Sequence, residues 1–179
     1  MATTPPAYLD FIAANNDYVA NRPVHHAGLS NLPSKRLTIV TCMDTRIDPH
    51  KQLGIRLGEA HILRNAGGAI TADVIRSIHL SQTALGTREV AVFHHTYCGA
   101  LPGTASASDT DAEKDADGNL LPSVYGDERA FCQFDQVEGS VKKSLHVLRT
   151  QGKLEPGTIL TGWVYDVISG RITKVEGPE

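Results

Sequence analysis

Short apolar runs alternate along the chain with stretches that have helical periodicity. Leu37 to Thr41 and Val90 to Phe93 are β-branched, apolar runs between polar flanks, a pattern typical of buried parallel strands. A further strand is expected at His61 to Leu63. The C-terminal sequence TILTGWVYDVISGRITKV predicts two more strands, joined by a turn at Ser169-Gly170.

Three segments have the spacing of amphipathic helices. The first belongs to an N-terminal helical arm, residues 1–30, whose apolar face consists of Tyr8, Phe11, Ile12 and Val19. The second begins at the cap residue Thr71 and ends before Gly86. The third starts near Asp127, and its apolar stripe consists of Phe131, Phe134, Val137, Val141, Leu145 and Leu148. Strands separated by helices indicate an α/β fold, a mostly parallel sheet of about four or five strands flanked by helices, in a single domain over residues 1–179.

Composition and charge narrow the class of protein. The chain has 179 residues, 41% of them hydrophobic and 21% charged, as in one globular domain. Seventeen basic and 20 acidic side chains give a net charge of −3, which offers no electrostatic surface to nucleic acid or an anionic membrane. No apolar run approaches the ~18 residues of a membrane span, and no signal peptide is evident. We therefore expect a cytoplasmic protein without a nucleic-acid or membrane partner.

Residues 103–126 differ in character from the rest of the chain. They are rich in Ser, Ala, Asp and Gly, and Lys114 is their only basic residue. This composition predicts an acidic, solvated surface loop. A calcium-binding loop is the alternative for the alternating acids, but the twelfth-position Glu of an EF-hand is absent.

Chemically reactive residues follow two of the predicted strands. The first strand leads into Cys42-Met43-Asp44-Thr45-Arg46, and the strand ending at Phe93 leads into His94-His95-Thr96-Tyr97-Cys98-Gly99. Ligand sites in open α/β sheets lie at the carboxyl ends of strands. If the two strands are neighbours, Cys42 and Cys98 can meet one imidazole, a ligand set suited to Zn²⁺ with one open position, as in catalytic zinc sites. Spacing alone does not choose between His94 and His95, which point to opposite sides of a strand.

Each of these residues also has a purely structural interpretation. A cysteine at a strand end is often a small core residue, and Asp44 with Arg46 can be an ordinary exposed ion pair. Cys132 lies on the third predicted helix, where packing is its expected role. The odd number of cysteines argues against a disulfide framework, and the absence of a Cys-x-x-Cys motif argues against a thiol-redox protein.

The combination of Cys-x-Asp-x-Arg with a later His-x-x-Cys-Gly resembles the β-class carbonic anhydrases. The resemblance extends from about Lys35 onward through RNAGGAITADVIRSI, LGTREVAVFHHTYCG and GWVYDVISGRI. The length and the form of the motifs are similar to a short microbial and fungal branch that also contains carbonyl sulfide hydrolases. The resemblance implies a homodimer as the basic unit, or a tetramer of two such dimers. The N-terminal helix fits this assembly, since Tyr8, Phe11 and Ile12 could lie across a partner subunit.

The resemblance also implies a role for each motif residue. One Zn²⁺ per chain would be bound by Cys42, His95 and Cys98, which selects His95 over His94. Asp44 would either occupy the fourth metal position in a resting state or pair with Arg46 and leave that position to water. In the second case Asp44 accepts the hydrogen of the zinc-bound hydroxide, and Arg46 holds the carboxylate ionised and in place.

Two further sets of residues border the expected site. Gly67 and Gly68, in the sequence Asn65-Ala66-Gly67-Gly68, could bring backbone N–H groups to an oxyanion or a bound bicarbonate, or could simply form a tight turn. Tyr97 could line the substrate pocket or pack against neighbouring residues.

The function predicted from the sequence is zinc-hydroxide attack on the carbon of a small linear heterocumulene. Hydration of CO₂ to bicarbonate is the first interpretation, and hydrolysis of carbonyl sulfide (COS) to H₂S and CO₂ is the alternative. The two substrates have nearly the same shape, so a COS-selective pocket should be slightly wider and more apolar beside the metal. A non-catalytic, zinc-stabilised binding module is a hypothesis from another class, and it requires a permanent fourth protein ligand.

Overall fold

The computed structural model describes residues 10–99 and 136–175. The predicted acidic loop at 103–126, Cys132 and the first part of the third predicted helix lie outside the described residues. The chain divides into two compact units, residues 1–30 and residues 31–179.

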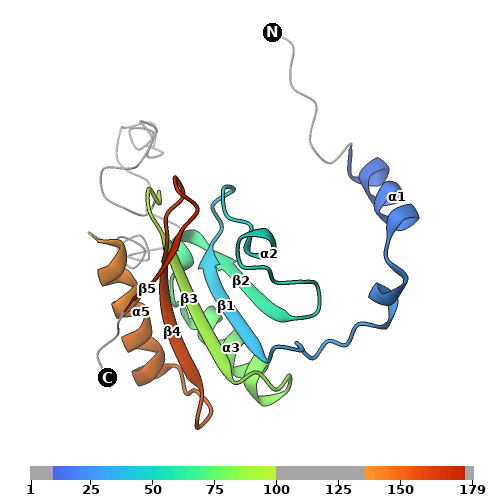
Figure 1. Ribbon diagram of the computed structural model, residues 1–179. Helices are drawn as coiled ribbons and strands as arrows, with labels where there is room; N and C mark the ends of the chain where they lie inside the picture. The colour runs from blue at the N-terminus through green and yellow to red at the C-terminus, as the bar shows by residue number, and fades with distance from the viewer. Residues whose placement is uncertain (1–9, 100–135, 176–179) are drawn as a thin grey trace, which may run out of the picture. The chain divides into compact units, whose positions relative to one another are not determined.

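The second unit is built on a five-stranded sheet with the order β2-β1-β3-β4-β5 (Figure 1). Its strands are β1 (Leu37–Cys42), β2 (Ala60–Asn65), β3 (Glu89–His95), β4 (Ile159–Tyr165) and β5 (Ile172–Val175). The first four strands are mutually parallel, and β5 is antiparallel to β4. The predicted α/β fold with a mostly parallel sheet is therefore confirmed.

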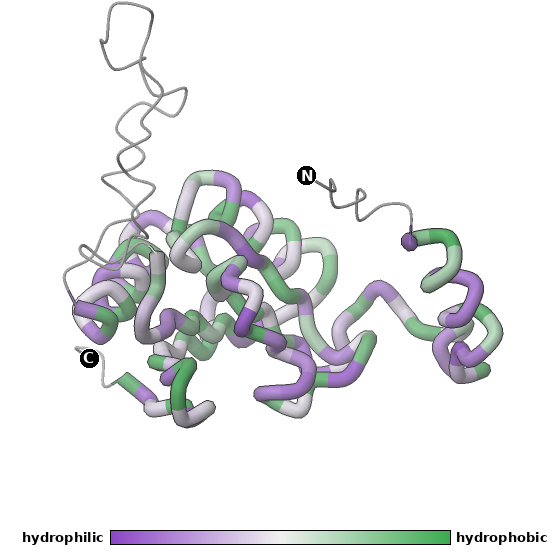
Figure 2. Tube along the Cα trace, turned by 90° about the horizontal axis from the view of Figure 1, so that it is seen from above, coloured by the Kyte–Doolittle hydropathy of each residue, from purple (hydrophilic) through white to green (hydrophobic). Residues whose placement is uncertain are grey.

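Two amphipathic helices, α3 (Ala72–Thr83) and α5 (Val137–Gln151), cover one face of the sheet (Figure 1). Only one side of each helix faces the strands, and Figure 2 shows hydrophilic and hydrophobic residues interleaved along the chain. The core between the two layers consists of Val40, Val74, Ile78, Val90, Val92, Val141, Leu145, Leu148 and Val175. Helix α3 begins where the sequence predicts, since Oγ1 of Thr71 accepts a hydrogen bond from the N–H of Val74.

The opposite face of the sheet carries a smaller apolar cluster. Ile39, Ala91 and Phe93 pack there with Ile55, and the ring of Phe93 stacks on Trp163 with centroids 5.8 Å apart. A short helix, α2 (Pro49–Gln52), lies on this side. The sequence pattern did not predict α2, because four residues are too few to show a periodicity.

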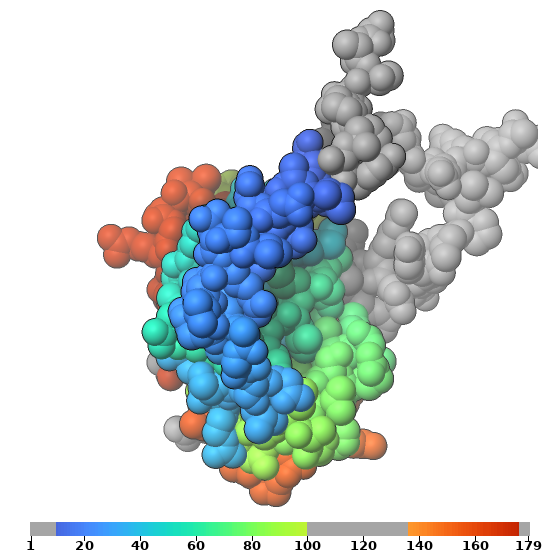
Figure 3. Space-filling view, turned by 90° about the vertical axis from the view of Figure 1, so that its right-hand side faces the viewer, coloured from blue at the N-terminus to red at the C-terminus, as the bar shows by residue number. Residues whose placement is uncertain are grey.

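The described part of the first unit, blue in Figure 3, contains α1 (Phe11–Asn21) and a 3-10 turn η2 (Val24–Gly28). Helix α1 ends before Arg22, as predicted, but none of its residues is buried. Its apolar side chains are exposed, with Phe11 at 64% and Ile12 at 73%. None of the helices in the described ranges is long and apolar enough to cross a membrane.

The order of the strands determines what lies at the carboxyl edge of the sheet. Strands β1 and β3 are adjacent and parallel, with Thr41 paired to Phe93. Cys42 is the last residue of β1 and His95 the last of β3, so both reach the same edge. This is the juxtaposition that a reactive site built from two strand ends requires.

Candidate metal centre

Cys42, His95 and Cys98 converge at the carboxyl edge of the sheet. All three side chains are buried, and their candidate ligand atoms lie within 4.8 Å of one another. The two sulfur atoms are 3.9 Å apart. Two thiols and an imidazole at such spacing form a borderline-soft donor set, which suits Zn²⁺.

The hydrogen bonding of His95 leaves one ring nitrogen for a metal. Nδ1 lies 2.9 Å from the carbonyl oxygen of Thr96, and because a carbonyl only accepts, Nδ1 carries the ring hydrogen. Nε2 is then an unprotonated acceptor, buried and without a hydrogen-bond partner among the described residues. An orphaned imidazole nitrogen beside two thiols fits a metal ligand better than a core histidine, which would be satisfied.

His94 points to the other face of the sheet. Nδ1 lies 2.5 Å from Oγ of Ser140 on α5, and Nε2 lies 3.2 Å from the carbonyl oxygen of Gly68. Burial lowers the pKa of His94 to about 4, so the ring is neutral at pH 7. The structure thus brings His95, and not His94, to the two cysteines.

The surroundings of Cys42 favour the thiolate that a metal ligand requires. Its pKa is lowered to about 4, mainly by a hydrogen bond from Cys98, against the opposing effect of burial. Hydrogen bonds from the backbone N–H groups of Asp44 and Gly67 lower the pKa further. A thiol that ionises this readily suits a ligand for a soft cation.

The carboxylate of Asp44 is paired with Arg46 at the edge of this group. Nη2 of Arg46 donates to Oδ2 at 2.6 Å and Nε donates to Oδ1 at 2.9 Å. These bonds lower the pKa of Asp44 to about 2. Oδ2 remains 3.9 Å from Nε2 of His95, so the carboxylate borders the three candidate ligands.

Arg64 is a positioning residue that sequence reasoning missed. Its Nε donates to the carbonyl oxygen of Cys42 at 3.0 Å, and its Nη2 donates to that of Asp44 at 2.8 Å. It therefore fixes the backbone that carries both side chains. A charged residue within a predicted strand is unusual, and this feature of Arg64 could have indicated its role from the sequence.

The two glycines of the turn η3 (Ala66–Gly68) pack closely against Cys42. Gly67 donates its N–H to the Cys42 sulfur. Gly68 has a φ of +67°, and a Cβ there would lie 3.1 Å from the carbonyl carbon of Thr41 and 3.2 Å from the nitrogen of Cys42. Only glycine fits this backbone conformation and this close approach. A direct contact of Gly67 or Gly68 with substrate stays a prediction.

Tyr97 lies in the turn between His95 and Cys98. Its φ is +53°, in the left-handed region, and its side chain is 60% exposed. Its carbonyl oxygen accepts a hydrogen bond from Nη2 of Arg46 at 2.9 Å. The backbone of Tyr97 thus helps to position Arg46, and a substrate contact by its ring stays a prediction.

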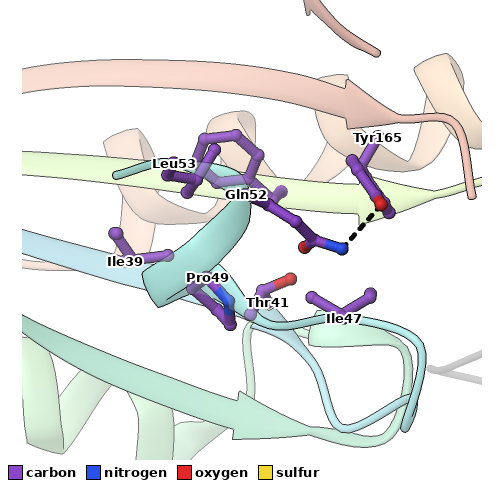
Figure 4. Close-up of a pocket in the computed structure, with 8 residues that line it drawn as sticks. Ile39, Thr41, Ile47, Pro49, Gln52, Leu53 and Tyr165 are labelled. Carbon is purple, nitrogen blue, oxygen red and sulfur yellow. Dashed lines mark hydrogen bonds between the residues drawn. The ribbon is translucent and has the colours of Figure 1, made fainter. Parts of the chain in front are cut away.

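Figure 4 shows a small, mainly apolar pocket in the second unit. Ile47 and Tyr165 line this pocket and also pack against Cys42 and Cys98. The complete lining is Ile39, Thr41, Ile47, Pro49, Gln52, Leu53, Phe93 and Tyr165. Sequence reasoning did not identify this pocket, because its walls come from segments far apart in the chain.

A parallel sheet whose strand ends combine two cysteines, a histidine and an arginine-held carboxylate has the arrangement expected of an enzyme of the carbonic anhydrase type. The carbonic anhydrase family model matches residues 37–172. The chain belongs to the β-carbonic anhydrase family, as the sequence motifs predicted. This family consists of zinc enzymes of the carbonate dehydratase type.

Individual relatives agree with this assignment. β-Carbonic anhydrase 1 of Mycobacterium tuberculosis is 38% identical over 168 residues, which cover 92% of this chain and 99% of that protein. The crystal structure of a carbonic anhydrase from Streptococcus mutans superposes with a TM-score of 0.78 at 37% identity, covering 97% of this chain and 100% of that one. A carbon disulfide hydrolase of Acidithiobacillus thiooxidans is 28% identical, covering 96% of this chain and 86% of that protein.

Proposed function

We propose that Cys42, His95 and Cys98 bind one Zn²⁺ per chain and that the protein hydrates CO₂ to bicarbonate. The observation that carries the proposal is the orphaned Nε2 of His95 beside two thiols. When bound, zinc lowers the pKa of a coordinated water to ~7, which makes hydroxide available at neutral pH. The chain contributes the ligands, a carboxylate beside them and an apolar pocket.

Asp44 would position the water that attacks CO₂. Its Oδ2 lies 3.9 Å from the candidate ligand nitrogen of His95, so the carboxylate borders the ligand group and can accept a hydrogen bond from a water held there. Arg46 keeps this carboxylate ionised and turned toward itself. An acceptor held in this way directs a lone pair of the water oxygen at the substrate carbon.

The alternative substrate class is a sulfur analogue of CO₂, either COS or CS₂. The chain is similar to carbon disulfide hydrolases as well as to carbonic anhydrases. The mainly aliphatic and aromatic lining of the pocket in Figure 4 suits either substrate. COS has one terminal oxygen, as CO₂ has, and one terminal sulfur, as CS₂ has. Water can attack the central carbon of all three molecules at the same site.

A non-catalytic, zinc-stabilised binding module is the hypothesis from another class. It requires a fourth protein ligand, and Asp44 is the nearest candidate. Two strong hydrogen bonds to Arg46 hold this carboxylate away from such a role. The arrangement therefore supports an open, catalytic position over a closed, structural one.

We also propose that the protein forms a homodimer or a tetramer. Helix α1 exposes Phe11 and Ile12, and an apolar face of this kind on a monomer is typical of an interface. A reducing compartment, such as the cytoplasm, suits two buried thiols whose sulfur atoms are 3.9 Å apart.

Steady-state turnover of all three substrates by one zinc-loaded preparation tests the function. CO₂ hydration is measured by stopped-flow proton release, and COS or CS₂ hydrolysis by the H₂S produced. We expect the highest kcat/KM for CO₂. A higher value for COS or CS₂ would favour the alternative, and bound zinc without any turnover would favour the binding module.

A further inference from the structure

The side-chain amide of Gln52 has its orientation fixed by two backbone groups. Nε2 donates to the carbonyl oxygen of Arg46 at 3.0 Å, and Oε1 accepts from the N–H of Asp48 at 3.1 Å. A carbonyl can only accept and a backbone N–H can only donate, so the amide cannot be turned over. Gln52 thereby also ties α2 to the segment that carries Arg46.

This orientation determines the role of the Tyr165 hydroxyl. The same Nε2 of Gln52 lies 2.6 Å from Oη of Tyr165 (Figure 4). Because Nε2 is a donor, Oη is the acceptor in this bond, and the hydroxyl hydrogen is left for another acceptor. Within residues 10–99 and 136–175, Gln52 is the only hydrogen-bond partner of this hydroxyl.

The free hydrogen belongs to a group in the apolar pocket beside the ligands. Tyr165 is the last residue of β4, is paired with His95 across the sheet, and is 8% exposed. It lines the pocket and packs against Cys42 and Cys98. A donor in a mainly apolar pocket discriminates between ligands that can accept a hydrogen bond and ligands that cannot.

We propose that Tyr165 is a specificity-determining residue, whose hydroxyl donates a hydrogen bond to a terminal oxygen of the substrate and so selects CO₂ over its sulfur analogues. The inference rests on the proposed function and extends it to substrate choice. When water attacks the central carbon, negative charge develops on the terminal atoms. An oxygen in that position accepts the hydrogen bond strongly, whereas sulfur is larger and a weak acceptor. COS, with one oxygen, should be intermediate.

The test compares kcat/KM for CO₂ and CS₂ in the zinc-loaded wild-type protein and in Tyr165→Phe. We expect a roughly 10- to 100-fold loss for CO₂ and a change of no more than about twofold for CS₂, because a ring without its hydroxyl keeps the apolar wall. Tyr18→Phe removes a hydroxyl from the exposed side of α1 and should change neither value.

A second variant, Gln52→Glu, tests the orientation of the hydroxyl. A carboxylate at this position accepts from Tyr165 instead of donating to it, and so turns the hydroxyl hydrogen away from the pocket. We expect the ratio of kcat/KM for CO₂ to kcat/KM for CS₂ to fall as in Tyr165→Phe. In the double variant this ratio should fall no further than in either single variant. In the zinc-free protein, the tyrosine doublet in the Raman difference spectrum should change from an acceptor to a donor pattern in Gln52→Glu.

Several outcomes would contradict the proposal. Equal losses for CO₂ and CS₂ in Tyr165→Phe would make the tyrosine merely structural. A shift in the ratio caused by Thr41→Val, and not by Tyr165→Phe, would assign the donor to the other hydroxyl of the pocket. A donor pattern for Tyr165 in the wild-type Raman spectrum would overturn the assigned orientation. Failure of the zinc-loaded wild type to turn over any of the three substrates would instead refute the proposed function, and selectivity with it.

Discussion

The guanidinium group of Arg46 donates two hydrogen bonds to the carboxylate of Asp44, from Nη2 to Oδ2 at 2.6 Å and from Nε to Oδ1 at 2.9 Å. The main-chain N–H of Arg46 adds a bond to Oδ1, also at 2.9 Å. Nη2 is in turn anchored by the carbonyl oxygen of Tyr97. The position of the carboxylate relative to the candidate ligands therefore depends on one guanidinium group.

Replacement of Arg46 by alanine should release Asp44 toward the metal. A free carboxylate can ligate zinc and exclude water, whereas a paired one is occupied. We expect CO₂ hydration to fall at least about tenfold, most severely at low pH. Raising the pH should recover part of the loss, because hydroxide then competes better with the carboxylate.

The pH–rate profile of zinc-loaded Arg46→Ala, followed by stopped flow, checks this expectation. Arg46→Lys is the matched control, since it keeps the charge but cannot form the two-point grip. It should fall between the wild type and Arg46→Ala. Wild-type rates for Arg46→Ala at every pH would show that the pair is an ordinary surface ion pair.

Replacement of Asp44 by alanine should have a different profile. It removes the competing ligand together with the hydrogen-bond acceptor for the attacking water. Zinc content should stay near one per chain, while turnover falls ~10²–10⁴-fold, the usual cost of losing a positioned hydrogen-bond partner. Little of the loss should be recovered at high pH. A profile that parallels Arg46→Ala would mean that the two residues do not have separate roles.

Zinc content should depend on the cysteines unequally. Cys98→Ser removes one of the two sulfur donors and should lose most of the metal, because a neutral hydroxyl is a poor zinc ligand. Cys132→Ser, which changes the third cysteine of the chain, should keep it. Elemental analysis of the purified proteins decides the matter, and equal losses in both variants would contradict the ligand assignment.

The strands that carry the site could be predicted because the local sequence pattern of each strand indicates its burial. Thr38 to Thr41 and Val90 to Phe93 are buried on both faces, and continuous apolar, β-branched runs are typical of such strands. Once these two strands were neighbours, the residues that follow them had to lie close together. The choice of His95 over His94 came from the family resemblance and not from the spacing, because the spacing does not show which face of β3 is covered by α5.

The remainder of the site depends on contacts that leave no local pattern. The hydrogen bond from Gln52 to Tyr165 joins residues 113 positions apart. Helix α2, which carries Gln52, is too short for a hydrophobic period. The apolar residues of α1 illustrate the reverse case, since their spacing predicted a helix correctly but did not reveal that the whole helix is exposed.

His94 should make the zinc-free protein less stable in mild acid. Burial lowers its pKa from 6.5 to about 4, so between these values the unfolded chain binds a proton that the folded protein does not. The free energy of unfolding should therefore decrease as the pH falls through this window, with a contribution from His94 of up to about 3 kcal/mol, and be unaffected by this residue above the window.

Urea denaturation of the wild type and of His94→Gln over the same pH range isolates this contribution. Glutamine keeps hydrogen-bonding atoms but does not titrate. The free energy of unfolding of His94→Gln should therefore be lower than that of the wild type at neutral pH but should vary less with pH. The other titrating groups are common to both proteins. His79→Gln, on the exposed side of α3, should follow the wild-type curve. If the free energy of unfolding of His94→Gln falls with pH as steeply as that of the wild type, the buried ring of His94 does not limit stability in acid.

Two glycine replacements at the contact of α5 with β4 should act in opposite directions. A Cβ on Gly162 would meet Leu145 at 2.8 Å and clash with Val141, so Gly162→Ala overfills the core and should destabilise by about 1–3 kcal/mol. Gly139, in the first turn of α5, has only the Cβ of Gln136 nearby, at 3.9 Å. Alanine there adds helix propensity without a clash and should stabilise by up to about 1 kcal/mol. Urea midpoints of the two zinc-free variants measure both effects, and a neutral or stabilising Gly162→Ala would mean that α5 does not pack against β4 as closely as described.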